Sequence, residues 1–374
     1  GTATALVAGG PGSLFWLWVA AFFGMATIFA EAVLAQTYRT KDEQGRVLGG
    51  PAYYIGNVIG SSFFASVFAV LLAVTYGLIF NSVQANTISL SMQTSFGFDT
   101  QMTGLAIAGF TALVIFGGLT RIAKVVGVMV PVMAGAYILV ALAVTALNIT
   151  MVPEVLVTIV RCAFDFDAVL GAGFGMALMT GIKRGLFSNE AGMGSTPHAH
   201  AVARVEHPAE QGLVAMFGVF TTVVIVTFTG IVILVTGVLD FKTTGIELTQ
   251  HAYTVGLGSF GMAFVAVCLF FFAFSTIMGW YFFGEQNVRF LFRSRGVLAY
   301  RVIVCAFIVT GAMLKVDFVW SLADLFNGLM VLPNLVALVA LHKVVGESLE
   351  DFEKKLDHYE VRKSENIDDR MQRL

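Results

Sequence analysis

Long apolar stretches, separated by short polar segments, recur along nearly the whole chain. Most of them reach the length of about 18 residues at which a helix crosses a hydrocarbon layer roughly 30 Å thick. We expect helical spans at 14–36, 62–92, 102–117, a stretch that ends near 148, 168–182, 212–238, 259–285, 297–314 and 318–345. A short helix at 1–8, whose beginning we expect to be missing, brings the total to about ten membrane segments.

The composition agrees with an all-α polytopic membrane protein. Hydrophobic residues make up 57% of the chain and charged residues only 12%, whereas soluble domains carry about 25% charged residues. The net charge of −2 gives no reason to expect nucleic acid. The three cysteines are far apart and form no CxxC motif, so the sequence suggests neither a disulfide framework nor a zinc site.

The segment 181–201, GIKRGLFSNEAGMGSTPHAHA, concentrates polar residues and glycines in an otherwise apolar chain. We expect Lys183 and Arg184 to end a span at a membrane face, with turns at Gly185, Gly192 and Gly194. The preceding span is rich in glycine, with Gly171, Gly173, Gly175 and Gly181. A glycine-broken membrane helix that enters a polar loop is typical of a solute pathway.

Other segments complete the predicted organisation. The sequence GGPG at 9–12 predicts a turn, and 153–167 predicts an amphipathic helix along the membrane surface. The charged tail 346–374 has acidic and basic residues four apart, which favours a helix. We therefore expect a membrane core at 1–345 and a separate tail.

The basic residues predict the orientation. With loops assigned to alternate sides, 19 of the 22 Lys and Arg lie on one side, and only Arg161, Lys242 and Lys315 lie on the other. The positive-inside rule makes the rich side, with the tail, cytoplasmic.

Ten segments, of which the first and sixth are interrupted by glycine, divide into halves of five at 1–150 and 151–345. An odd number of spans in each half gives the halves opposite orientations. This topology predicts an inverted repeat, in which broken helices meet at mid-membrane to bind solute and ion.

Four motifs carry a resemblance to a known family: GGPGSLFWLWVAAFFGMATIFAE at 9–31, GGPAYYI at 49–55, GIKRGLFSNEAGMGSTPHAHA at 181–201 and STIMGWYFFGEQN at 275–287. The chain resembles the alanine/glycine:cation symporters, also called sodium:alanine symporters, along essentially its whole length. The resemblance implies a leucine-transporter-like fold of five plus five inverted helices. It also implies sodium-driven, or in some members proton-driven, import of alanine or glycine across a bacterial or archaeal plasma membrane. The family's GTGN segment would lie just upstream of Gly1, and the resemblance implies that it supplies backbone groups to solute and sodium.

Hydroxyl groups in the last motif are candidate sodium ligands, because a hard cation prefers oxygen. The resemblance favours Thr276, together with Ser275, although both hydroxyls could instead bond their own helix backbone. Trp280 could close over a small side chain or serve as a core aromatic residue.

Further candidates lie in other spans. Phe174 could likewise close over a small side chain or serve as a core aromatic residue. Its neighbours Gly173 and Gly175 could present backbone N–H groups to a carboxylate or simply permit close helix packing. Asn81 and Gln84 could hold an ammonium group or join helices.

Carboxylates inside a membrane are functional candidates by default. For Glu31 and Glu285 we expect salt bridges from an inner gate to a loop Arg, and for Glu190 a bracing role at the same gate. Asp324 could relay a proton if sodium is not the coupling ion. The pair His198 and His200 lacks a third metal ligand at recognisable spacing.

The sequence thus predicts a sodium-coupled symporter with no other cofactor, acting within a lipid bilayer. The same fold could carry another small neutral solute or couple to protons. A channel would need a selectivity filter, and a membrane enzyme would need a cluster of nucleophiles or metal ligands. Neither pattern is present, nor is a GxSxG, P-loop or HExxH motif.

Overall fold

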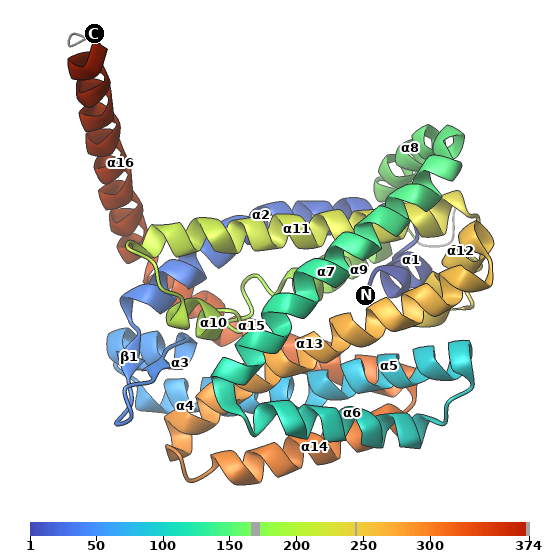
Figure 1. Ribbon diagram of the computed structural model, residues 1–374, viewed down its shortest axis with the longest axis horizontal. Coiled ribbons are helices and arrows are strands. Elements are labelled where there is room, and N and C mark those ends of the chain that lie inside the picture. The colour runs from blue at the N-terminus through green and yellow to red at the C-terminus, as the bar shows by residue number, and fades with distance from the viewer. Residues whose placement is uncertain (166–172, 244, 372–374) are drawn as a thin grey trace.

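The computed structural model describes residues 1–165, 173–243 and 245–371, most of which lie in helices packed into one bundle (Figure 1). In this part of the chain, six helices are long and apolar enough to cross a membrane: Gly12–Thr37, Ser62–Phe96, Thr120–Leu147, Pro208–Val235, Ser259–Phe292 and Val316–Ala340. Two shorter apolar helices, Thr100–Ile115 and Val297–Met313, accompany them. The expectation of an all-α membrane protein with multiple spans is confirmed.

The first part of the chain contains α1 (Thr2–Gly9), α2 (Gly12–Thr37), α3 (Pro51–Tyr54), the π-helix η1 (Ile55–Ile59), α4 (Ser62–Val74), the π-helix η2 (Thr75–Phe80), α5 (Asn81–Phe96), α6 (Thr100–Ile115) and α7 (Gly118–Leu147). A small hairpin follows α2. Its strands β1 (Thr40–Lys41) and β2 (Val47–Leu48) pair antiparallel, with Thr40 opposite Leu48.

The second part contains the 3-10 helix η3 (Ile149–Met151), α8 (Val152–Ala163), α9 (Phe174–Asn189), α10 (Pro197–Val202), α11 (Pro208–Val235), α12 (Gly245–Leu257), α13 (Ser259–Phe292), α14 (Val297–Met313), α15 (Val316–Ala340) and α16 (His342–Met371). The turn at 9–12 is confirmed, since Gly10 separates α1 from α2 with a φ of 67°. The amphipathic helix is confirmed as α8, although residues 166 and 167 of the expected stretch lie outside the described part.

Two expected boundaries are wrong, and one helix was not expected. The span at 318–345 ends at Ala340, because α16 begins at His342. The span at 168–182 continues as α9 to Asn189, so Gly185 lies inside a helix rather than at a turn; residues 168–172 lie outside the described part. The sequence analysis also assigned no element to 245–257, where the structure has α12.

The structure differs most from the sequence-based expectation at the polar segment 181–201. This segment lies beside α2, along the length of that helix. Near the start of α2, a Cβ on Gly181 would lie 2.5 Å from the carbonyl oxygen of Ser13. Near the middle of α2, a Cβ on Gly24 would lie 3.0 Å from the Cβ of Ala191. Together α9, the loop 190–196 and α10 therefore form one interrupted helical segment beside α2, to which we refer as the interrupted crossing.

The end of α2 completes this alignment. Gln36 Nε2 donates to the carbonyl oxygen of Ala203 at 3.0 Å, and Arg39 donates to the same oxygen at 2.9 Å. Lys183 and Arg184 do not end the span as expected, because α9 continues to Asn189, and Arg184 is buried.

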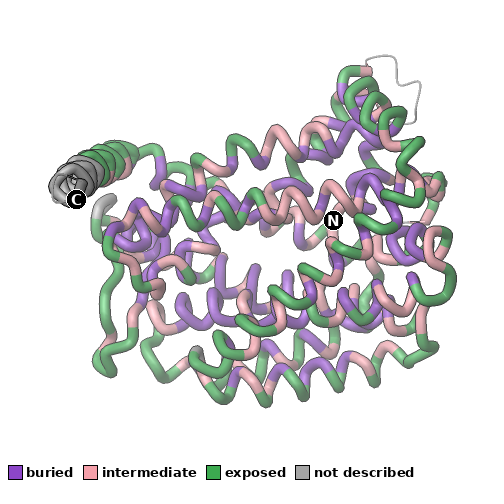
Figure 2. Tube along the Cα trace, turned by 45° about the horizontal axis from the view of Figure 1, so that its top comes forward, coloured by how far each residue is buried: buried purple, intermediate pink, exposed green. Residues whose placement is uncertain are grey.

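The outside of the bundle is apolar and much of its polar content is inside. Large side chains on α6, α7 and α14 are exposed, among them Leu113, Val132 and Leu298, while Asn86 and Asn334 are buried. Figure 2 shows the exposed residues on the outer sides of the helices and the buried ones between them. This distribution suits a lipid environment, because soluble proteins rarely expose large continuous apolar patches.

The tail forms the helix α16, which projects away from the bundle (Figure 1). The first half of α16 contacts the loop before α11: the His207 ring stacks on Phe352 with ring centres 5.2 Å apart, and its Nε2 lies 3.1 Å from Asp351. An ion pair between Asp351 and Lys355, at 2.8 Å, confirms the expected spacing of charges four apart. Lys355 and His207 together hold the pKa of Asp351 below its ordinary value.

The side chain of Tyr300 on α14 fits between two glycines. Its hydroxyl donates to the carbonyl oxygen of Ala73 at 2.9 Å. A Cβ would lie 1.6 Å from this hydroxyl at Gly77 and 1.8 Å from it at Gly284, so both positions require glycine. Close approach through small residues is how membrane helices gain van der Waals contact.

We predict that Gly284→Ala destabilises the protein by about 1–3 kcal/mol, because the added methyl group overlaps the Tyr300 hydroxyl and its helix must shift. Thermal unfolding in detergent measures the effect. Gly279→Ala, on the same helix, is the matched control, because a Cβ there has no neighbour within 4 Å. Equal melting temperatures for the two variants would contradict the overlap.

Candidate functional site

A cavity of about 440 Å³ lies inside the bundle. Helices α5, α7, α9, α11, α12, α13 and α15 contribute to its walls, as does the start of the chain. Its polar lining residues are Thr2, Gln84, Asn86, Thr87, Tyr137, Ser188, Glu190, Thr229, Glu247, Thr249 and Thr276, and its aromatic lining residues include Phe187, Phe272, Trp280 and Trp320. A largely apolar concave space with a few polar groups is the usual form of a small-molecule site.

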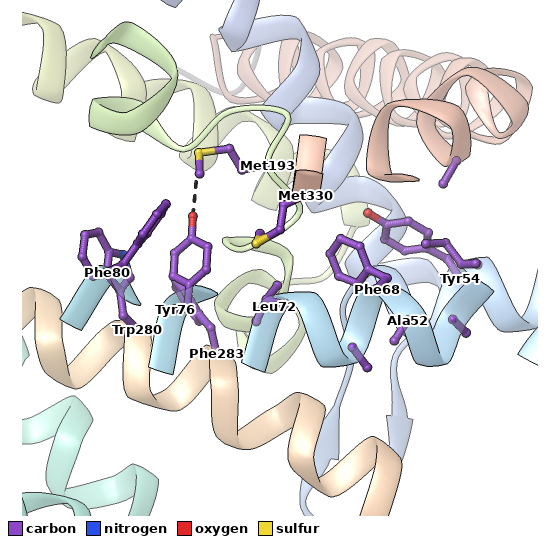
Figure 3. Close-up of a cluster of buried hydrophobic side chains, with 14 of the residues drawn as sticks. Ala52, Tyr54, Phe68, Leu72, Tyr76, Phe80, Met193, Trp280, Phe283 and Met330 are labelled. Atoms are coloured by element: carbon purple, nitrogen blue, oxygen red, sulfur yellow. Dashed lines mark hydrogen bonds between the residues drawn. The ribbon is translucent and has the colours of Figure 1, made fainter. Parts of the chain in front are cut away.

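Trp280 forms part of this lining and is 4% exposed. Its ring contacts Tyr76 and Phe80, with ring centres 5.5 and 5.2 Å apart, and the three rings lie together in Figure 3. Phe187, at 5.9 Å, joins the same group from α9. The aromatic cluster holds Trp280 in one orientation beside the cavity.

Glu190 lies where α9 ends, and its backbone is left-handed, with a φ of 57°. Few residues other than glycine adopt this conformation, which costs roughly 1–2 kcal/mol. Each carboxylate oxygen of Glu190 accepts a hydrogen bond, one from the Trp280 indole N–H and one from the Ser195 hydroxyl at 2.6 Å. The carboxylate therefore joins α13 and the loop 190–196 at the cavity wall.

The two hydroxyl candidates on α13 differ in position. Thr276 lines the cavity, whereas Ser275 does not belong to the described lining. Both hydroxyls donate to the carbonyl oxygen of Phe272, at 2.8 Å from Thr276 and 2.9 Å from Ser275. Their oxygens keep lone pairs that can accept or coordinate.

The two polar candidates on α5, Asn81 and Gln84, also differ in position. Gln84 lines the cavity. Asn81 is fully buried outside the described lining, and its Nδ2 donates to the carbonyl oxygen of Gly77 at 3.1 Å. Asn86, which the sequence analysis did not single out, also lines the cavity and donates to the carbonyl oxygens of Gly311 and Leu314, so it joins α5 to the end of α14.

The glycine cluster lies at the start of α9, far along the helix from Glu190. Gly173 precedes the helix and Phe174 begins it. The Phe174 ring contacts Trp16 edge-on, with ring centres 5.7 Å apart. None of Gly173, Phe174 and Gly175 belongs to the described lining of the cavity.

Glu31 is fully buried and holds the loop 190–196 in place. Its oxygens accept the backbone N–H groups of Gly194, at 2.8 Å, and Gly192, at 3.2 Å. Asn334 on α15 donates to Glu31 at 2.6 Å and to the carbonyl oxygen of Gly192 at 3.0 Å. The expected partner was a loop Arg; the described partners are instead backbone amides and a side-chain amide, because the glycine-rich loop lies inside the bundle.

Gly192 and Gly194 have φ values of 85° and 77°. These left-handed conformations aim their N–H groups at one carboxylate, and they confirm the turns expected at the two residues.

Glu285 does form the expected ion pairs, but with residues on helices. Arg289 on α13 donates to one oxygen through its Nε at 2.8 Å, and Arg301 on α14 lies 3.5 Å from the other. Tyr281 donates to the same carboxylate. The group joins the ends of two helices that are consecutive in the sequence.

Asp324 is paired with Arg184, which the sequence analysis placed at the membrane surface. One guanidinium nitrogen of Arg184 lies 2.7 and 2.6 Å from the two oxygens of Asp324, and the guanidinium stacks on Trp320, 4.6 Å from the ring centre. The sequence signal for this ion pair was Arg184 itself, because a charged side chain inside a membrane requires a partner.

The two histidines have separate partners. The Nε2 atom of His198 lies 2.8 Å from the Asn287 amide, and the Nδ1 atom of His200 lies 2.8 Å from the Gln211 amide. Within the described ranges, no group of three or more His, Cys, Asp or Glu could hold a metal ion.

Several known proteins are similar to this chain in sequence. The model of the sodium:alanine symporter family matches residues 1–366. The amino-acid carrier protein AlsT of Bacillus subtilis is 44% identical, over 95% of this chain and 76% of its own length. The probable sodium/glutamine symporter GlnT of the same organism is also 44% identical, with 95% and 75% covered. The sodium/alanine symporter AgcS of Methanococcus maripaludis is 41% identical, with 98% and 81% covered.

A family match over nearly the whole chain, with relatives above 40% identity, is sufficient to assign the family. The chain therefore belongs to the sodium:alanine symporter family and is a transporter rather than an enzyme.

Proposed function

We propose that this protein is a sodium-coupled secondary active symporter that imports alanine, glycine or both by alternating access. The observation that carries the proposal is the interrupted crossing 174–202, whose loop places Glu190 at the wall of the internal cavity. Broken helices with a binding site at the break are the common device of coupled transporters.

The helices can be grouped into two sets of five crossings. The first set is α1, α2, the continuous helix from α4 to α5, α6 and α7. The second is α9 with α10, α11, α13, α14 and α15. This grouping supports the five-plus-five inverted repeat and the division near residue 150.

The predicted orientation in the membrane does not change when Lys183 and Arg184 are assigned to a helix instead of a loop. Lys183 and Arg184 no longer count as loop residues, which leaves 17 of the 19 basic residues on the rich side. We therefore propose a plasma-membrane protein with α16 in the cytoplasm.

The cargo could be a larger neutral amino acid. A cavity of about 440 Å³ does not by itself restrict the solute to alanine, and a close relative is named a probable sodium/glutamine symporter. Proton coupling is the alternative for the ion. Under that alternative Asp324 would have to leave Arg184 before it could relay a proton.

We predict that the protein, reconstituted in proteoliposomes, accumulates radiolabelled L-alanine when an inward sodium gradient is imposed. Unlabelled glycine should compete with it. Parallel competition with glutamine and leucine tests the size of the cargo. Accumulation driven by a pH gradient alone would contradict sodium coupling, and equilibration without accumulation would indicate a channel.

We also predict that Thr276→Ala raises the half-saturating sodium concentration by about fivefold, the effect of losing roughly 1 kcal/mol from one ligand. Ser275→Ala is the matched control, because its hydroxyl makes the same bond to Phe272 but lies outside the described cavity lining. Sodium-dependent alanine uptake measures both variants. An unchanged sodium dependence in well-expressed Thr276→Ala protein would remove Thr276 from the sodium site.

A further inference from the structure

The charged side chains around the cavity all have one sign. Among the described lining residues, Glu190 and Glu247 are acidic, and none is Lys, Arg or His. The buried guanidinium of Arg184 on α9 is engaged with Asp324. A cavity with this lining favours the positive end of a ligand, because a buried carboxylate gains most from a nearby cation.

Glu190 retains capacity to bind. An ionised carboxylate has about four acceptor positions. Trp280 and Ser195 donate to two of those on Glu190, and the neutral Tyr76 hydroxyl also interacts with the carboxylate. No described ion pair involves Glu190. The carboxylate is thus oriented by neutral donors and left without a counter-charge.

The position of Glu190 in the fold increases this preference. It follows Asn189, the last residue of α9, so it lies at the negative end of the helix. Glu247 is different, because it lies in the first turn of α12 and is exposed. Of the two cavity carboxylates, Glu190 is therefore the better placed to hold a bound cation.

We propose that Glu190 binds a small monovalent cation in the cavity, either the ammonium group of the amino acid or a sodium ion. This inference rests on the proposed function and names the group that receives the positive charge. Trp280 positions that group, since its N–H fixes one carboxylate oxygen while its ring lines the cavity.

The test compares Glu190→Gln with Glu154→Gln in purified protein, since Glu154 on α8 is exposed and lies outside the described cavity lining. Glutamine keeps the size and the acceptor oxygen of Glu190 but removes the charge. Equilibrium binding of radiolabelled L-alanine is measured over a range of sodium concentrations at constant ionic strength. We expect Glu190→Gln to weaken binding by about tenfold or more, as for loss of a charged hydrogen-bond partner, and Glu154→Gln to bind as the unmodified protein does.

The sodium titration separates the two sources of the cation. A weaker alanine affinity at saturating sodium, with an unchanged half-saturating sodium concentration, assigns the ammonium group to Glu190. A raised half-saturating sodium concentration assigns sodium. Unchanged values for both would overturn the proposal.

Two further measurements keep the test decisive. If Glu190→Gln does not fold, Trp280→Phe retains the carboxylate and removes its donor; a smaller loss of the same affinity supports the proposal, and no loss overturns it.

If the unmodified protein binds no alanine, the proposed cargo fails. Sodium binding is then measured alone, as thermal stabilisation by sodium chloride relative to potassium chloride, and a stabilisation that persists in Glu190→Gln overturns the role of Glu190.

Discussion

The carboxylate of Glu31 makes the interrupted crossing possible. A chain that leaves the helical conformation inside a membrane exposes backbone N–H groups, and each must find a partner there. Glu31 accepts two of them, from Gly192 and Gly194, and Asn334 binds both the carboxylate and the carbonyl oxygen of Gly192. Helices α2 and α15 thereby fix the loop between α9 and α10, and the loop in turn fixes Glu190 at the cavity.

Two further polar contacts join the interrupted crossing to the rest of the bundle. On α9, the ion pair between Arg184 and Asp324 connects it to α15. At its centre, Glu190 connects it to Trp280 on α13. These contacts involve single side chains, whereas the packing of α14 around Tyr300 involves close backbone approach. If the transporter alternates its access, the polar contacts are the ones that a moving segment can break and remake.

Helical spacing predicted some of the site and missed the rest. Gln84, Thr276 and Trp280 do line the cavity. Their neighbours Asn81 and Ser275 are buried outside the described lining, because a polar stripe can face either a cavity or another helix and the spacing is the same for both. The glycine cluster at 173–175 is ambiguous in a similar way, since glycine permits both ligand binding by backbone N–H groups and close helix packing.

The sequence alone determined that this is an all-α membrane protein, which family it resembles and where most helices lie. Hydropathy suffices for the fold class and the helices, because lipid imposes the same requirement on every residue that faces it, and the four motifs carry the resemblance to the family. Only the tertiary structure decided that 181–201 lies within the bundle beside α2, and which groups bind the carboxylates of Glu31, Glu285 and Asp324. The physical reason is that a polar residue avoids lipid equally well in a loop and in the interior, so its position depends on partners distant in the sequence.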